Sequence, residues 1–113
     1  MSTITQNSRL LTMINVFSVA PERQQELVDL LVEATEQTVR VLPGFISANI
    51  HKSVDGIRVT NYAQWESKEA FENFLSNSGA NAHFKIAEKI ADQIDYHLYS
   101  VVHVSSRADR VLR

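Results

Sequence analysis

The sequence predicts an α+β fold of the ferredoxin-like class, a four-stranded antiparallel sheet with helices on one face. Three observations support this prediction. The 113 residues suit one domain with a single core and one small ligand site. Short apolar and β-branched runs alternate with stretches of helical periodicity, in the order β-α-β-β-α-(α)-β. Asp55-Gly56, between the second and third strand-like runs, is a strong hairpin signal.

The first half of the chain predicts a strand followed by a long helix. Leu10 to Val19 is rich in β-branched and apolar residues, as strands are. Pro21 suits the first turn of a helix. Apolar residues then recur every three or four positions from Leu27 to Val41, and Pro43-Gly44 ends the helix. Residues 1–9 are polar, so we expect a loose arm there.

The second half predicts three strands and two short helices. Ser67 is suited to cap the first of these helices, whose apolar face ends at Leu75. Asn77-Ser78-Gly79 is expected to break that helix before a second one begins. The domain is expected to span residues 10–104. Its remaining elements are predicted at 45–53 (strand), 58–65 (strand), 82–91 (helix) and 95–104 (strand), with a polar tail at 105–113.

Composition excludes several classes of protein. The chain has no cysteine, so it has no disulfide, no thiol nucleophile and no thiolate metal site. The net charge of −2 gives no sign of a nucleic-acid surface. No apolar run approaches the roughly 18 residues that a membrane span needs. We therefore expect a cytoplasmic protein without a nucleic-acid or membrane partner.

The predicted strands carry apolar residues on both faces. In the first strand, Met13 and Phe17 point one way, and Ile14 and Val16 point the other. Because helices cover only one face of a ferredoxin-like sheet, the other face would expose apolar side chains to water. The sequence therefore predicts a homodimer that packs sheet against sheet.

The third strand holds the strongest candidate site. Val59, Asn61, Ala63 and Trp65 alternate with outward residues and share one face. An amide in mid-strand is unfavourable for strand formation, and a buried amide or indole N–H needs a hydrogen-bond partner. On an apolar wall, Asn61 and Trp65 could hold a carbonyl or phenolate oxygen and stabilise negative charge that develops there.

The hairpin register decides which residues join this face. A two-residue Asp55-Gly56 loop pairs Ile50 with Asn61 and Ile46 with Trp65, and places His51 beside Thr60 on the opposite face. A bulge or a three-residue loop would reverse this and bring His51 to Asn61. The four histidines lack the spacing of a metal pair, so no metal site is expected.

The segment from Gly44 to Ser67, GFISANIHKSVDGIRVTNYAQWES, resembles the antibiotic biosynthesis monooxygenase (ABM) family. This resemblance implies a ferredoxin-like fold that forms a dimeric α/β barrel through its sheets. It also implies a cofactor-independent monooxygenase that oxidises a polyphenol or anthrone-like aromatic substrate with O2 to a quinone. Asn61 and Trp65 would be the catalytic pair that holds the substrate oxygen.

The helices depart from the family's pattern. Phe71 stands where a tyrosine is expected and Lys85 where an arginine is expected, and Ile50 replaces a tyrosine beside the hairpin histidine. These three residues, with His51 and His83, are the expected substrate-binding positions. His83 opens the last helix, where it would lie either at the rim of the pocket or exposed to solvent.

Two alternatives remain open at this level. A branch of the same family degrades haem with an asparagine on the first strand, a tryptophan and a helical histidine, and Asn15, Trp65 and His83 could take those roles. Haem would be a cofactor only under that alternative. The other alternative is a non-catalytic dimer that binds an apolar ligand.

Overall fold

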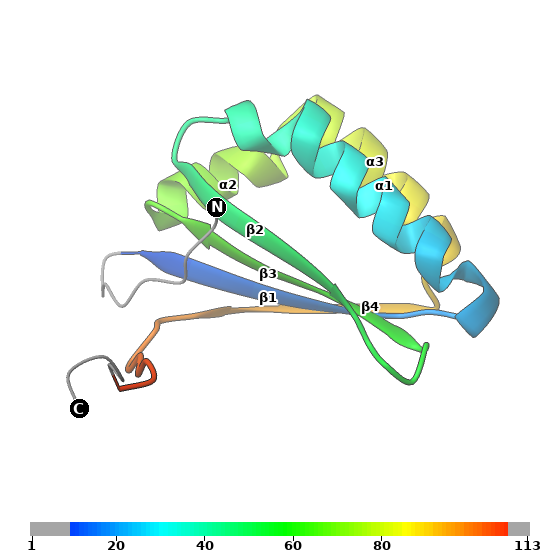
Figure 1. Cartoon of the computed structure of the whole chain (residues 1–113). Coiled ribbons are helices and arrows are strands. Elements are labelled where there is room, and N and C mark those ends of the chain that lie inside the picture. Colours follow the sequence, from blue (N-terminus) through cyan, green and yellow to red (C-terminus); the bar gives the residue numbers. More distant parts are fainter. Residues whose placement is uncertain (1–9, 109–113) are drawn as a thin grey trace.

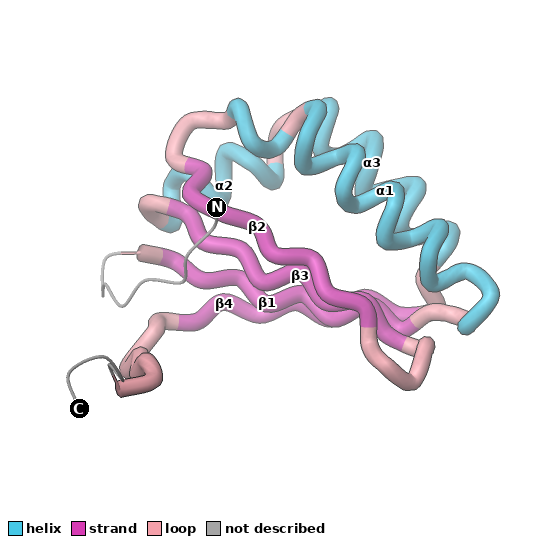
Figure 2. The backbone as a smooth tube through the Cα atoms, in the orientation of Figure 1, coloured by secondary structure: helices cyan, strands magenta, loops and turns pink. Residues whose placement is uncertain are grey.

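The computed structural model describes residues 10–108, and it confirms the predicted ferredoxin-like class. The helices lie together over one face of a single antiparallel sheet whose strand order is β2-β3-β1-β4 (Figures 1 and 2). The predicted arm at 1–9 and the end of the predicted tail lie outside the described residues. The elements are β1 (Leu11–Ser18), α1 (Gln24–Gln37), β2 (Phe45–Lys52), β3 (Arg58–Trp65), α2 (Lys68–Leu75), α3 (Ser78–Ile90) and β4 (Gln93–Tyr99).

Several element boundaries differ from the predicted ones. The expected first helix is α1 with a separate 3₁₀ turn before it at Pro21–Arg23 and another after it at Val39–Val41. The predicted break between the two helices is present, but it is confined to Ser76 and Asn77. The Asn77 side-chain oxygen accepts a hydrogen bond from the Ala80 N–H at 3.0 Å and caps α3, which therefore begins at Ser78. The last strand ends at Tyr99 rather than at residue 104.

The β2–β3 register matches the prediction over most of the hairpin. Ile50 pairs with Asn61 and His51 with Thr60. The predicted pairing of Ile46 with Trp65 is wrong, because a β-bulge between Phe45 and Ser47 brings Phe45 opposite Trp65 instead. The bulge turns Ile46 outward, where it is exposed.

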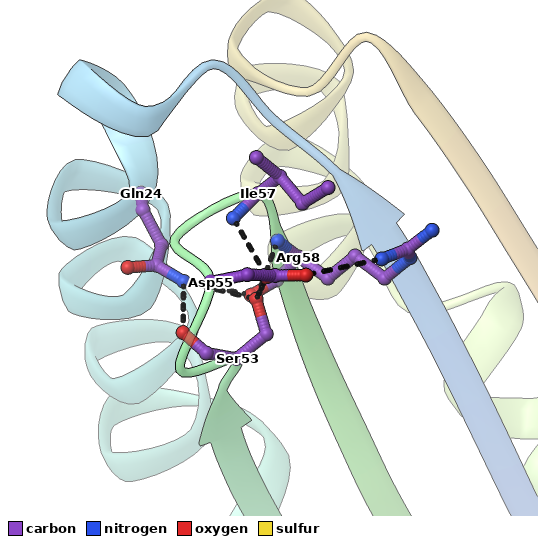
Figure 3. Close-up of polar contacts among 5 residues, drawn as sticks. All are labelled: Gln24, Ser53, Asp55, Ile57 and Arg58. Atoms are coloured by element: carbon purple, nitrogen blue, oxygen red, sulfur yellow. Dashed lines mark hydrogen bonds and ion pairs between the residues drawn. The ribbon is translucent and has the colours of Figure 1, made fainter.

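The hairpin turn is longer than the predicted two residues, yet it keeps the same register. The Ser53 N–H donates to the Arg58 carbonyl at 2.9 Å, so four residues connect the two strands. Asp55 accepts hydrogen bonds from the Ser53 hydroxyl at 2.6 Å and from the Ile57 N–H at 3.3 Å (Figure 3). Gln24, at the start of α1, donates to the carbonyls of Ser53 and Arg58 at 3.1 and 2.9 Å. Because the loop is two residues longer, parity is preserved and Asn61 stays on the face toward the helices.

Gly44 fixes the approach of α2 to the sheet. Its φ is +83°, a left-handed conformation that glycine adopts without strain. A Cβ atom added there would lie 2.4 Å from the Cβ of Ala70 in α2. The Gly44 carbonyl also accepts a hydrogen bond from the Glu66 N–H at 2.8 Å, which joins the start of β2 to the end of β3.

The buried core between sheet and helices has two parts. One lies toward the hairpin turn and contains Phe17, Val19, Leu27, Val59, Ala87 and Ile90. The other lies toward α2 and contains Met13, Ala63, Trp65, Ala70 and Phe71. Along β1, Asn15 stands between Phe17 of the first part and Met13 of the second. The core is therefore divided at the level of the Asn15 side chain.

The face of the sheet away from the helices is more polar than the strand pattern predicted. Ile14, Val16 and Tyr62 lie there, half-buried. Next to the Ile14–Tyr62 pair, Thr12 and Gln64 are almost fully buried, and the Gln64 amide donates to the Thr12 hydroxyl at 3.1 Å. No helix within residues 10–108 is long and apolar enough to cross a membrane.

Candidate active site

A cavity of about 200 Å³ lies between the sheet and all three helices, where the core is divided. Its apolar walls come from β1, α1, α2 and α3 and include Met13, Phe17, Leu31, Phe71, Phe74 and Phe84. Its polar lining is small and consists of Asn15, Thr35, Asn61, Asn81, His83 and Tyr96. A concave apolar space with a few polar groups is typical of a site for a small organic ligand.

Two asparagines face each other across the floor of this cavity. Asn15 on β1 pairs with Asn61 on β3, so the two side chains are cross-strand neighbours on the helix-facing side. The side-chain oxygens of both are buried and have no hydrogen-bond partner within residues 10–108. Buried amides without partners are costly, and such groups concentrate where a ligand completes the bonding. The pair therefore offers donors and acceptors to a molecule in the cavity.

Trp65 shares the face of Asn61, as predicted, but it does not line the cavity. Its side chain is 1% exposed and lies among aromatic rings. The Phe74 ring stacks on it with centroids 5.0 Å apart, and Phe45 and Phe71 meet it edge-on at 5.4 and 6.3 Å. Phe71 and Phe74 do line the cavity, so they stand on the side of Trp65 that faces it. The indole N–H is buried and unpartnered within the described residues.

Two of the predicted substrate-binding residues line the cavity. Phe71 is buried at the wall that α2 contributes. His83 is half-buried on the first half of α3, and its Nδ1 lies 3.0 Å from the Gly79 carbonyl oxygen. The sequence left His83 open between a rim position and full exposure, and the structure places it at the cavity.

The other three predicted substrate-binding residues do not line the cavity. Ile50 shares the face of Asn61 but packs against the core cluster toward the hairpin turn. His51 pairs with Thr60 on the opposite face and is exposed, since the longer turn preserved the register that excludes it. Lys85 is exposed on the outer side of α3, because α3 turns His83 and Phe84 toward the cavity and Lys85 away from it.

Sequence reasoning missed four of the polar lining residues, Asn15, Thr35, Asn81 and Tyr96. Asn15 was named only under the haem alternative, and the other three were not named as site residues. Asn15 pairs with Asn61 on one side and with Tyr96 on the other, which forms one row across three strands. A second mid-strand asparagine, at the same parity as the core residues Met13 and Phe17, was the available signal.

Among residues 10–108, the cavity lining contains no carboxylate, lysine or arginine, and its polar groups are amides, hydroxyls and the His83 imidazole. The groups with shifted pKa values lie elsewhere. The pKa of Glu26 is lowered by its hydrogen bond from Arg23, and the pKa of Asp55 is lowered mainly by the Ser53 hydroxyl. Within residues 10–108, no three side chains of His, Asp and Glu gather as a metal site would require.

Comparisons with known proteins identify the family of this chain. A family model described as antibiotic biosynthesis monooxygenase matches residues 10–88. The chain is 44% identical over 91 residues to the tetracenomycin-F1 monooxygenase of Streptomyces glaucescens, covering 80% of this chain and 81% of that protein. Both findings confirm the resemblance seen in the Gly44–Ser67 segment.

Solved structures agree on the fold. A monooxygenase from the gene ActVA-Orf6 of Streptomyces coelicolor, in complex with the ligand nanaomycin D, superposes with a TM-score of 0.76 at 26% identity. That match covers 87% of this chain and 92% of the other. SnoaB, a cofactor-independent oxygenase from Streptomyces nogalater, has a TM-score of 0.74 at 21% identity over 85% of this chain and 96% of its own.

Proposed function

Because the chain belongs to the antibiotic biosynthesis monooxygenase family, we propose that its cavity oxidises a phenolic aromatic substrate of the anthrone or polyphenol class to a quinone with O2. The observation that carries this proposal is the pair of amides, Asn15 and Asn61, on the floor of an apolar cavity, whose buried side-chain oxygens have no hydrogen-bond partner within residues 10–108. The 44% identical relative is itself named a tetracenomycin-F1 monooxygenase, which supports a monooxygenase reaction here.

The amide pair suits a substrate that carries both hydroxyl and carbonyl oxygens. An amide N–H donates to a carbonyl or phenolate oxygen, and an amide oxygen accepts from a hydroxyl. Around the pair, apolar side chains keep water away, which strengthens each polar contact with developing charge. Asn61 therefore holds the oxygen on which negative charge builds up, and Asn15 orients a neighbouring hydroxyl.

No cofactor is needed for the electron balance of this reaction. An anthrone methylene and O2 give a quinone carbonyl and water, so the substrate itself supplies all the electrons. The ionised substrate reacts with O2, a C–O bond forms, and loss of water from the resulting hydroperoxide gives the quinone. Stabilising the substrate anion is the task that falls to the protein, and donors placed at the developing oxyanion perform it.

Trp65 contributes a second donor when Phe74 moves aside. The Phe74 ring stacks on the face of the Trp65 indole, whose buried N–H has no hydrogen-bond partner within residues 10–108. The cavity of about 200 Å³ is also below the roughly 300–1,000 Å³ typical of pockets for drug-sized ligands. Displacing Phe74 would enlarge the space and expose the Trp65 N–H at once. We therefore assign Trp65 to the substrate-bound state.

A haem-degrading activity is less consistent with this geometry. His83 has a ring nitrogen that could bind iron, and Asn15 lies in the same cavity. A haem is much larger than an anthrone, however, and the apolar walls that α1 and α2 contribute leave only about 200 Å³. Titration with haem tests this alternative, because axial ligation gives a sharp Soret band that His83→Ala would remove.

The homodimer belongs to the same proposal. The sheet face away from the helices carries Ile14, Val16 and Tyr62, and a second copy of the chain would cover it. Light scattering should give twice the monomer mass. Val16→Glu would place a charge at the centre of the buried contact and should give a monomer.

Oxygen uptake with an anthrone tests the reaction. Protein freed of metal by chelation and of flavin by dialysis should consume O2 and form the quinone. Under ¹⁸O₂, one labelled atom should enter the product, whereas simple dehydrogenation of a hydroquinone would label none. Asn61→Ala should reduce turnover by roughly 100-fold or more.

The matched control is Asn49→Ala. Asn49 is on the other face of the sheet, where its amide donates to the Tyr62 carbonyl at 3.1 Å. That variant should turn over at close to the wild-type rate. Stabilisation by apolar ligands without any O2 uptake would instead support the non-catalytic binding protein.

A further inference from the structure

The hydrogen bond at His83 fixes which ring nitrogen carries the proton. Nδ1 lies 3.0 Å from the Gly79 carbonyl oxygen, one turn earlier in α3. A carbonyl only accepts hydrogen bonds, so Nδ1 must carry the hydrogen. In the neutral ring, Nε2 then holds the free lone pair. The backbone of α3 therefore holds His83 in the tautomer that can accept a proton at Nε2.

Nε2 has no competing partner. It makes no hydrogen bond within residues 10–108, and His83 lines the cavity. The lining residues that β1, β3, α1 and α2 contribute are all without ionisable groups. From β4, Tyr96 lines the cavity, and α3 adds Ala80, Asn81 and Phe84 beside His83. Among the described lining residues, His83 is thus the only one whose side chain has a basic nitrogen.

We propose that His83 is the general base that ionises the substrate in this cavity. The inference rests on the proposed function, since it supplies the anion with which O2 reacts. The amides Asn15 and Asn61 are neutral and can hold an anion but cannot remove the proton that creates it. His83 on α3 therefore removes the proton, and the amides of Asn15 and Asn61 on the sheet hold the resulting anion.

The proton returns within one turnover. Nε2 takes the proton from the acidic hydroxyl of the substrate, which gives an imidazolium and a substrate anion. The anion gives its electrons to O2, and a C–O bond forms at the ring carbon. The peroxide anion then takes the proton back from Nε2. The neutral Nε2 next removes the hydrogen that remains on the same carbon, the O–O bond breaks as the quinone carbonyl forms, and the departing hydroxide takes that proton from Nε2 and leaves as water. No other acid or base is required, and His83 ends the cycle neutral.

The variant His83→Asn removes the proton-accepting nitrogen and should keep the local structure of α3. An asparagine side chain can still donate to the Gly79 carbonyl, so α3 keeps its hydrogen bond, but it has no nitrogen that accepts a proton. The control is His97→Asn, an exposed histidine paired with Asp95 at 2.9 Å on the other face of the sheet. Both variants should keep the unfolding midpoint of the wild type.

Anaerobic mixing tests ionisation separately from oxidation. A phenolic substrate whose anion absorbs at longer wavelength is added without O2, at a pH below the pKa of the free substrate. Wild type and His97→Asn should show the anion band and His83→Asn should not. The anion band does not require any reaction with O2. The experiment therefore distinguishes failure of the general base from failure of the proposed oxidation. An equally strong anion band in His83→Asn would overturn the inference.

Steady-state turnover gives the second test. General-base catalysis contributes typically 10²–10⁴-fold, so His83→Asn should lose at least about 100-fold in kcat/KM below the substrate's pKa. Above that pKa the substrate arrives ionised and most of the loss should disappear, whereas Asn61→Ala should stay impaired at both pH values. A defect of His83→Asn that is independent of substrate ionisation would contradict the assignment.

Discussion

Two regions on the helix-facing side of the sheet each contain polar groups. The amide row, Asn15 and Asn61, lines the cavity, whereas the Trp65 indole of the aromatic cluster (Phe45, Trp65, Phe71 and Phe74) does not. Asn61 lies opposite Asn15 on the floor of the cavity, and its buried side-chain oxygen has no hydrogen-bond partner within residues 10–108. Trp65, four residues along β3, is covered by Phe74 and is only 1% exposed. Strand alternation determines the face on which a side chain lies, but aromatic residues of α2 determine whether a ligand can reach it.

The largest effect should come from Asn61→Asp, which puts a carboxylate where the substrate's negative charge develops. We expect kcat/KM to fall by about 10³-fold or more, because a favourable donor is lost and a like charge is added. The unfolding midpoint should change little at pH values where the carboxyl is protonated. Turnover at or above the wild-type rate would show that the amide row does not hold the reacting oxygen.

Gly44→Ala tests how closely α2, which carries Phe71 and Phe74, must pack against the sheet. The left-handed φ and the close approach to Ala70 both oppose a side chain there. We expect the free energy of unfolding to fall by about 1–3 kcal/mol, with α2 displaced from the sheet. Gly56→Ala is the matched control, since its φ is +85° but the added Cβ meets only Pro21 at 3.9 Å. Equal losses in the two variants would attribute the effect to backbone strain alone.

Trp65→Phe should have a smaller effect than either variant above. It concerns both the aromatic cluster and the binding of substrate in the cavity. It removes an N–H that has no protein partner, so no existing hydrogen bond is lost. If the N–H meets substrate after Phe74 moves, kcat/KM should fall by about tenfold or more. In the wild type, Trp65 is the one tryptophan, so its fluorescence should change when an aromatic ligand binds. Phe74→Leu should produce part of that change without ligand, and an unchanged spectrum in both experiments would contradict the proposed movement.

The sequence was sufficient to predict the fold, because its signals are local. Alternation gave the four strands, and the hairpin turn gave a register that holds from Ile50 to Asn61 even though the turn has two more residues than predicted. The bulge near Phe45 was not predictable, since no glycine or proline lies within 45–47 to mark it. Its consequence was limited to Ile46, which points outward.

The site was only partly predictable, because it depends on contacts between distant segments. Asn61 was recognisable as an amide out of place in a strand. The partner Asn15 required the β1–β3 pairing, 46 residues apart in sequence. The exclusion of Lys85 and the cover over Trp65 required the rotation of α3 and the position of α2. Periodicity places a residue on a face, but it does not place the neighbouring helix.

The smallest expected effect concerns the hairpin turn, which keeps Asn61 in register. The pKa of Asp55 is lowered chiefly by the Ser53 hydroxyl and then by the Ile57 N–H. A carboxyl with a lowered folded-state pKa stabilises the fold above its unfolded pKa, and this contribution is lost as pH falls through the folded value. The unfolding midpoint should therefore decrease slightly on acidification, and Ser53→Ala should reduce that decrease. Glu26, whose pKa is also lowered by Arg23, contributes in the same direction, so Glu26→Gln serves as the comparison. Unaltered acid sensitivity in Ser53→Ala would show that the turn does not depend on the Asp55 charge.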